Sequence, residues 1–335
     1  MSEEILVSII VPIYNSEAVL SYCLKSIQKQ THCRFEGFLI DDGSTDGSLA
    51  IAERFAKEDT RFVVQHIENS GIATAQNIGL SLASGEFITF CDNDDILHPE
   101  YIERLLLACL STKSDIAACK WQHIGISDLV DVMSVKPSSD KLLATPKILT
   151  QSARDYQLIF SKITRVLKRA EYRYLNEANW SKLYRRHLFE TLRFPDGHFA
   201  QDVFVAMDLY LAANQVASIP DVLYYWLQQN SSASHSVKSF AYYEDIYQAA
   251  FKNLHLARSK NILPARSVYS IEGTLKKMAG VLRSDEQKQR FISAQLAYRT
   301  VKRQLTLRER LEVFLLCWIR RAETFVYDRT LHVKE

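Results

Sequence analysis

Over its first 120 residues the chain alternates short, β-branched apolar segments with segments whose apolar residues recur at helical intervals. This alternation predicts strands at 6–13, 35–41, 61–67, 86–91 and 115–121, and helices at 16–30, 49–58, 72–84 and 99–110. Strands and helices at such spacing form βαβ units around a mostly parallel, doubly wound sheet. The sequence therefore predicts an α/β fold, in which ligands bind beyond the carboxyl ends of the strands.

The alternation ends near residue 121, and most of the remaining chain has helical spacing. Residues 121–150 form an irregular excursion, and one strand pair is expected at 215–228. Beyond residue 235 the apolar spacing predicts helices at 239–259, 264–283, 286–304 and 307–328. We therefore expect a change of domain near residue 235.

The composition is that of an ordinary soluble globular protein, with 47% hydrophobic and 24% charged residues among 335. The net charge of +2 argues against nucleic acid as a partner, because such domains usually carry a marked basic excess. The N-terminus lacks the basic segment of a secretory signal, and no apolar run approaches the ~20 residues that span a bilayer. The six cysteines lack C-x-x-C spacing and are expected to be reduced. These features predict a cytoplasmic location, or one at the cytoplasmic face of a membrane.

Three carboxylates, Asp92, Asp94 and Asp95, directly follow the fourth expected strand. Neighbouring like charges raise a carboxylate's pKa, so the cluster costs stability unless a cation or proton joins it. An EF-hand loop needs glycine where this chain has Leu97, which excludes that site. An aspartyl phosphatase stays open, although it should have Thr or Val in place of Ile96. The other interpretations are a solvated loop that caps the next helix, and a divalent cation that shares its coordination with a diphosphate.

Four segments occur in a fixed order: SIIVPIYNSEAVLSYCLKSIQKQT, FLIDDGSTDGS, ENSGIATAQNIGLSLASGEFITF and CDNDDILHP. Together they closely resemble the nucleotide-sugar-binding half of family 2 inverting glycosyltransferases, which have the GT-A fold. The resemblance covers residues 5–120, and a weaker similarity in NWSKLYRRHLF, GHFAQDVFVAMDLYLAA and DVLYYWLQQNSSAS reaches residue 234. It implies a GT-A domain at 1–235, with a donor half at 1–120 and an acceptor and catalytic half at 121–235. The helical region 236–335 matches no motif.

The resemblance assigns the ends of the first two strands to the nucleobase. Pro12, Tyr14 and Asn15 would lie against the base, where Tyr14 offers an aromatic face and Pro12 a fixed backbone. Asp42 matches the residue that accepts the uracil N3–H, and Gly43 lets the backbone approach. Apart from the resemblance, the same residues fit a strand end and an ordinary turn.

The remaining donor contacts that the resemblance implies come from the acidic run and the third helix. Asp92, with Asn93 beside it, matches the residue that faces the ribose and diphosphate, and Asp94 matches the metal ligand. Mn²⁺ or Mg²⁺ suits such oxygen ligands and would act as a Lewis acid toward the leaving nucleoside diphosphate. Gln76 and Asn77 stand where the family usually has Arg-Asn, so a basic contact to the donor is missing.

Inversion at the anomeric carbon needs a base on the face opposite the leaving group. The family supplies it from an E-D pair ahead of a helix, and this chain has Gln201 and Asp202 there. Asp202 is therefore the expected base, with a helix N-cap as its alternative role. Trp180 and Lys182 match the stretch before the base, where Trp180 would stack on a sugar and Lys182 would meet phosphate. A core position is the alternative for Trp180.

Two other features bear on partners. An arginine that often follows YYW in the family is absent from 227–230, so Lys182 or Arg185 replaces it or the donor differs. The segment 307–327 combines an apolar run with arginines and Trp318, a pattern that suits an anionic membrane interface. The alternative is a helix that docks on the catalytic domain or on a second subunit of a homo-oligomer.

The sequence therefore predicts an inverting, metal-dependent glycosyltransferase whose donor is a nucleotide-sugar, with UDP as the expected nucleotide. The expected acceptor is lipopolysaccharide, capsule or a lipid-linked oligosaccharide. One alternative is an inactive GT-A module, which only Gln76 and Gln201 favour. The other is a sugar-phosphate nucleotidyltransferase, which needs a Gly- and Arg-rich phosphate loop where this chain has VPIYNSEA.

Overall fold

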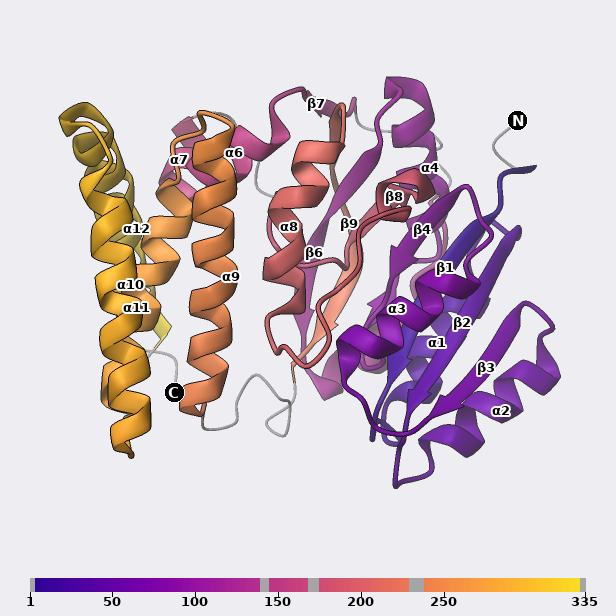
Figure 1. Ribbon diagram of the computed structural model, residues 1–335. Helices are drawn as coiled ribbons and strands as arrows, with labels where there is room; N and C mark the ends of the chain where they lie inside the picture. The colour runs from indigo at the N-terminus through magenta and orange to yellow at the C-terminus, as the bar shows by residue number, and fades with distance from the viewer. Residues whose placement is uncertain (1–3, 139–144, 168–174, 229–237, 332–335) are drawn as a thin grey trace. The chain divides into compact units, whose positions relative to one another are not determined.

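The computed structural model describes residues 4–138, 145–167, 175–228 and 238–331 (Figure 1). The chain divides into two compact units. The sheet unit comprises Met1–Thr150, Ala178–Gly197 and Ala212–Ser236, and the helical unit comprises Gln151–Glu177, His198–Leu211 and Val237–Glu335. The expected domain change near residue 235 lies outside the described residues, as do Gln229 and Asn230 of the expected donor segment.

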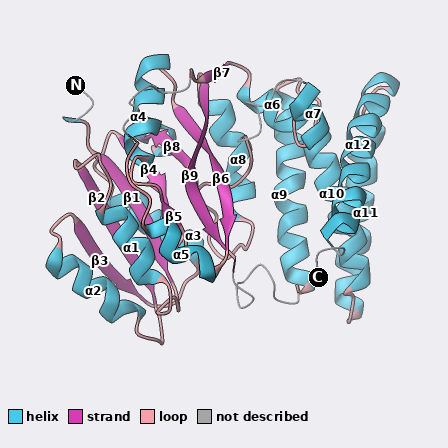
Figure 2. Ribbon diagram, turned by 180° about the vertical axis from the view of Figure 1, so that it is seen from behind, coloured by secondary structure: helices cyan, strands magenta, loops and turns pink. Residues whose placement is uncertain are grey.

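The sheet unit is built on a mixed sheet whose first half is parallel (Figure 2). The strands are β1 (Val7–Ile13), β2 (Phe35–Asp42), β3 (Phe62–Ile67), β4 (Phe87–Phe90), β5 (Ile96–Leu97), β6 (Ile116–Ile124), β7 (Lys147–Leu149), β8 (Lys182–Arg185) and β9 (Val216–Leu227). Their order is β3-β2-β1-β4-β8-β6-β9-β5, and β7 also pairs with β9. β1 is parallel to β2 and β4, so the chain leaves these three strands at one edge.

Helices cover both faces of this sheet. They are α1 (Leu20–Gln28), α2 (Ser48–Glu58), α3 (Ile72–Leu82), α4 (Tyr101–Thr112) and the short α5 (Leu129–Met133). Val7, Ile9 and Val11 of β1 enter the core that α1, α2 and α4 share, and α1 and α2 lie in front of the strands in Figure 2. Ile10 points to the other face, where α3 crosses so closely that a Cβ on Gly79 would lie 2.5 Å from its side chain. Successive strand residues face opposite sides, which explains this division.

The helical unit contains α6 (Ser152–Leu158), α7 (Lys162–Leu167), α8 (Gln201–Ala212), α9 (Phe240–Ser259), α10 (Ala265–Gly280), α11 (Asp285–Arg303) and α12 (Leu307–Leu331). Its core brings Phe160 together with apolar residues of α9 to α12. The hydroxyls of Ser239 and Ser284 cap α9 and α11 by accepting backbone N–H bonds. Within the described part of the chain, no helix is both long and apolar enough to cross a bilayer.

The predicted strands and helices of the first 120 residues are confirmed to within a few residues, as are the four C-terminal helices. The expected strand pair at 215–228 is wrong, because β9 runs unbroken through Pro220 and Asp221. Its pairing with β6 is irregular at this point, since Ser218 pairs with Ala118 but Val222 pairs with Lys120. A bulge therefore accommodates Pro220 within a single continuous strand. The six cysteines are free thiols, and all but Cys33 are buried.

Candidate functional site

The carboxyl ends of β1 and β2 are joined through the loops that follow them. Asn15 has a positive φ of 46°, and its side-chain oxygen accepts a bond from the Thr45 N–H at 2.8 Å. Its own N–H donates to the Ser44 hydroxyl at 3.1 Å. Tyr14 is 48% exposed beside it, whereas Pro12 is buried within β1. Of the three residues expected at the nucleobase, Tyr14 presents a free aromatic face and Asn15 fixes the loop.

Asp42 ends β2 and is 4% exposed. Its two carboxylate oxygens accept the backbone N–H groups of Ser70 at 2.7 Å and Gly71 at 2.9 Å, at the start of α3. A carboxylate has about four acceptor sites, so each oxygen can still accept a second bond. Gly43 follows with a φ of 71°, where a Cβ would lie 2.7 Å from the Asn69 nitrogen. Asp42 therefore anchors α3 and retains the capacity to accept a ligand N–H.

Gln76 and Asn77 lie side by side on α3 but differ in their surroundings. Gln76 is fully buried, and neither atom of its amide has a hydrogen-bond partner among the described residues. The Asn77 amide donates to the Phe194 carbonyl at 2.8 Å and accepts the Phe194 N–H at 3.0 Å. Asn77 thus holds the segment around residue 194 against α3, whereas the donor and acceptor groups of the Gln76 amide are unsatisfied within the described residues.

The acidic run lies at the end of β4, and burial raises the pKa of the Asp94 carboxyl. Asp95 is fully buried, and it accepts the Tyr224 hydroxyl at 2.5 Å and the Leu227 N–H at 2.9 Å. Burial, and then the charges of Asp92 and Asp94, raise the pKa of Asp95 well above its ordinary range. Asp95 joins the loop to β9 and does not begin α4, because β5 intervenes. Asn93 is half-buried between Asp92 and Asp94.

The acidic run suits a divalent cation that takes part of its coordination from the phosphates of a bound substrate. Among the residues that the structure describes, no group of three or more His, Cys, Asp or Glu side chains makes a complete metal site. Mg²⁺ commonly binds through one or two carboxylates while substrate phosphates fill its other positions. Asp92 and Asp94 are both half-buried and fit that role, since a cation would offset the repulsion between their charges.

Trp180 belongs to an aromatic cluster beside the acidic run. Its ring stacks on Tyr224 at a centroid distance of 4.9 Å and contacts Trp121 at 5.4 Å and Trp226 at 5.7 Å. Tyr224 is the residue whose hydroxyl bonds Asp95. Tyr224 and Trp226 were not among the site residues predicted from the sequence. The YYW motif was the only sequence feature that could have indicated them. The three tryptophans remain half-buried, so this cluster is core on one side and exposed on the other.

Lys182 is only 1% exposed, at the start of β8. Its ammonium donates to the Ala178 carbonyl, and its own backbone carbonyl accepts the Thr89 hydroxyl at 2.8 Å. These contacts serve the fold and do not support the expected phosphate contact.

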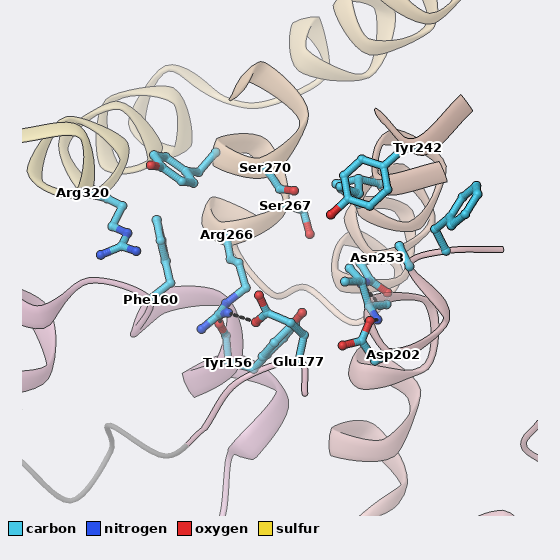
Figure 3. Close-up of a pocket in the computed structure, with 16 residues that line it drawn as sticks. Tyr156, Phe160, Glu177, Asp202, Tyr242, Asn253, Arg266, Ser267, Ser270 and Arg320 are labelled. Atoms are coloured by element: carbon cyan, nitrogen blue, oxygen red, sulfur yellow. Dashed lines mark hydrogen bonds and ion pairs between the residues drawn. The ribbon is translucent and has the colours of Figure 1, made fainter. Parts of the chain in front are cut away.

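In the helical unit, α8 begins at Gln201, so the N-cap position is Ala200 and Asp202 lies in the first turn. One oxygen of Asp202 accepts the Val203 N–H at 2.7 Å. The preceding loop is tied to α9, because Asp245 accepts bonds from the Phe199 N–H at 2.9 Å and the His198 ring at 3.0 Å. Asp202 lines a cavity of about 480 Å³ within this unit (Figure 3).

Comparison with known proteins places these features in a family. The sequence profile of Glycosyl transferase family 2 matches residues 8–199. GlyG, a glycosyltransferase of Streptococcus pneumoniae, is 31% identical over 257 residues, which are 76% of this chain and 80% of GlyG. The glycosyltransferase GlyA of the same organism is 30% identical over 228 residues, 68% of this chain but only 31% of GlyA. The match thus spans about a third of the longer relative.

Two solved structures are similar in fold. Staphylococcus aureus TarS 1–349, in complex with UDP-GlcNAc, has a TM-score of 0.59 and 25% identity, over 86% of this chain and 79% of that one. The mannosyltransferase PcManGT of Pyrobaculum calidifontis, in complex with GDP-Man and Mn²⁺, has a TM-score of 0.50 and 18% identity. That likeness covers 96% of this chain and 87% of PcManGT, and at this identity it bears on the fold alone.

Proposed function

The chain belongs to glycosyl transferase family 2 and has the GT-A fold, and we propose that it transfers a sugar, with inversion, from a UDP-sugar to a glycan hydroxyl. The observation that carries this proposal is the end of β4. Asp94 is half-buried there, desolvation of its carboxyl raises its pKa, and the described acidic side chains stop short of a complete metal site. A nucleoside diphosphate with its own oxygens and a divalent cation would satisfy both conditions.

The nucleobase is assigned to the ends of β1 and β2. Tyr14 would stack on the base with its exposed ring. Asp42 would accept the N3–H of uracil on a lone pair that its bonds to Ser70 and Gly71 leave free. UDP is the preferred nucleotide because cytosine has no N–H at this position, and the UDP-GlcNAc complex of TarS is in keeping with this choice.

Asp94 would hold Mn²⁺ or Mg²⁺ directly, and Asp92 would face the ribose and diphosphate. When bound, such a cation acts as a Lewis acid toward the departing diphosphate. The Mn²⁺ in the GDP-Man complex of PcManGT is compatible with this cofactor in the fold. Around the sugar, the exposed side of the cluster formed by Trp121, Trp180, Tyr224 and Trp226 offers a stacking surface.

Asp202 would be the general base. In an inverting transfer, the acceptor oxygen forms a bond to the anomeric carbon while the bond to the diphosphate oxygen breaks. The electron pair leaves with UDP, and Asp202 takes the proton of the acceptor hydroxyl. The bonds of Asp245 and Asn253 to the loop and first turn of α8 would hold this carboxylate in place.

The acceptor would be a glycan or lipid-linked glycan of the cell envelope. TarS is named a poly(ribitol-phosphate) β-N-acetylglucosaminyltransferase and is 29% identical over 72% of this chain, which favours a polymer over a free monosaccharide as the acceptor. Free cysteine thiols are in keeping with a reducing, cytoplasmic setting.

α12 would place the protein on an anionic membrane surface. Leu307, Leu311, Phe314, Trp318 and Phe325 are all more than half exposed and recur at intervals of three, four and seven residues, which puts them on one face. By the same periodicity three arginines flank this stripe and three glutamates lie away from it: Arg308, Arg310 and Arg321, and Glu309, Glu312 and Glu323. An apolar stripe with basic borders suits an anionic interface better than a second copy of this chain.

The proposal is tested by the affinity for UDP with and without Mn²⁺, measured by calorimetry on the wild type and on Asp94→Ala. We expect Mn²⁺ to strengthen UDP binding in the wild type and to have no effect in the variant. An Asp94→Ala protein that keeps the Mn²⁺ dependence would contradict the metal assignment. A wild type that binds UDP but turns over no UDP-sugar across a broad acceptor panel would favour the inactive GT-A module.

A further inference from the structure

The helical unit contains a cavity that none of the donor contacts above uses. Its volume of about 480 Å³ lies within the range of small-molecule pockets. Its walls come from α6, α8, α9, α10 and α12, from the segments next to α6 and α8, and from Glu177 ahead of β8. Asp202 lies at one side of it, and Arg320 lies at the other (Figure 3). The cavity is therefore a separate compartment that the expected base reaches.

Aromatic rings make much of the wall. Tyr156, Phe160, Tyr242 and Tyr269 all line it. The Phe160 and Tyr269 rings contact each other at a centroid distance of 5.5 Å, and Tyr156 and Phe160 both lie beneath the Arg266 guanidinium. Aromatic rings combine a flat apolar face with a polar edge or tip, so they suit a ligand that is apolar on one face and hydroxylated at its rim.

Polar groups point into the same space. Asn253 is 2% exposed, and its amide N–H donates to the Val203 carbonyl at 2.8 Å. Its carbonyl oxygen is buried without a partner among the described residues. The hydroxyls of Ser267 and Ser270 and the phenol of Tyr242 also point toward the interior (Figure 3). A buried amide oxygen without a donor is unusual, and a ligand hydroxyl would satisfy it.

The charged side chains around the cavity carry no net positive charge. Arg266 forms an ion pair with Glu177 at 2.5 Å and also donates to the carbonyls of Tyr156 and Leu175, so most of its donors are occupied. Arg320 pairs with Glu323 at 3.2 Å. Asp202 adds a further negative charge to the wall. A phosphate needs spare guanidinium or ammonium donors, and this cavity has no excess of them.

We propose that this cavity binds the acceptor as an uncharged, hydroxyl-rich sugar ring. The proposal rests on the proposed function only in that Asp202 would take the proton of a hydroxyl bound there. The aromatic walls would pack on the ring faces, and Asn253 and Ser270 would bond hydroxyls at its rim. The acceptor end is therefore a neutral glycan residue and not a phosphate-bearing polyol.

The test uses saturation-transfer NMR on the full chain without donor. The probes are the methyl β-glycosides of glucose, galactose and N-acetylglucosamine, with glycerol phosphate as the anionic comparison. Ser270→Trp would fill the cavity from α10 at a residue whose side chain makes no hydrogen bond in the described structure. Lys276→Trp is the matched control, because it adds the same side chain at an exposed position of the same helix. Tyr242→Ala is a second variant that removes one aromatic wall without adding bulk.

We expect at least one glycoside to give saturation transfer with the wild type and with Lys276→Trp. The affinity should fall by about tenfold or more in both Ser270→Trp and Tyr242→Ala, which is about 1.4 kcal/mol. Absence of a signal from every glycoside overturns the proposal, as does an unchanged signal in both variants or binding of glycerol phosphate alone. UDP binding in the presence of Mn²⁺ is measured on the same samples. Its loss with intact glycoside binding would refute the proposed function and leave this site standing.

Discussion

Gln76 offers a sharp test of how polar groups behave at this site, because the chain contains a matched counterpart. Gln76 and Gln157 are both fully buried. Neither amide atom of Gln76 has a partner in the described structure. The Gln157 amide donates to the Ser267 hydroxyl at 2.9 Å and accepts the Ser267 N–H at 3.2 Å. The same substitution, Gln→Leu, should therefore have opposite effects at the two positions.

The magnitudes follow from the number of buried groups left without partners. Gln76→Leu removes two unsatisfied groups from the core, and each such group costs about 1–3 kcal/mol, so the gain should be at least about 1 kcal/mol after repacking. Gln157→Leu leaves the N–H and hydroxyl of Ser267 without hydrogen-bond partners, which should lower the free energy of unfolding by about 1–3 kcal/mol or more. Gln and Leu have similar helix propensities, so that difference cancels.

Thermal unfolding of the two variants without ligand measures both effects, at about 2–4 °C per kcal/mol for a domain of this size. A shift in the same direction for both would refute the reasoning. Calorimetry on Gln76→Leu then tests the donor role. If the Gln76 amide contacts the UDP-sugar, its removal should lower the affinity for the donor by about tenfold. Unchanged affinity for the donor would remove Gln76 from the donor site.

Three further outcomes are expected. Asp42→Ala should weaken UDP binding by ~1.5–3 kcal/mol, abolish the preference for UDP over CDP, and destabilise the start of α3. A variant that still prefers UDP over CDP would show that the base is recognised elsewhere. Burial would raise the pKa of Glu272, but bonds from Lys302, Tyr298 and Arg321 outweigh it and hold the pKa below the ordinary 4.5. The charged form of Glu272 therefore stabilises the fold above pH 4.5, and this stabilisation is lost as the pH falls through the lowered pKa. Glu272→Gln should lower Tm at pH 7 and lower it less at pH 3. An equal decrease in Tm at both pH values would contradict this. Trp318→Ser should reduce sedimentation with phosphatidylglycerol vesicles relative to the wild type. A wild type that dimerises in solution and does not bind the vesicles would favour a second copy on α12.

The first 120 residues could be predicted from the sequence because their signals are local. Apolar periodicity within β1 to β4 and α1 to α4 depends on residues a few positions apart. β8 and β9 were not predicted correctly, since β8 pairs with β4 about a hundred residues earlier and β9 pairs with three strands, β5, β6 and β7, that are distant in the chain. Pairing between distant segments leaves little trace in one sequence.

The site residues likewise divide into those that a local motif predicts and those that only contacts between distant segments reveal. The acidic run and Asp42 were found because their neighbours form recognisable motifs. The bond from Asp95 to Tyr224 joins residues 129 positions apart, so only the structure reveals that Asp95 is a buried support for β9. Asn77 likewise holds Phe194, which is 117 residues away. The cavity beside Asp202 is assembled from separate helices of the helical unit, and no single segment predicts it.

The most direct test of the account is the product formed from an α-linked UDP-sugar in the presence of Mn²⁺, with its anomeric configuration read by NMR. The account predicts a β-linked product from the wild type. Asp202→Asn should form the same product about 10²–10⁴-fold more slowly while its affinity for UDP stays unchanged. An α-linked product, or equal turnover by Asp202→Asn, would contradict the claim that this chain is an inverting transferase with Asp202 as its base.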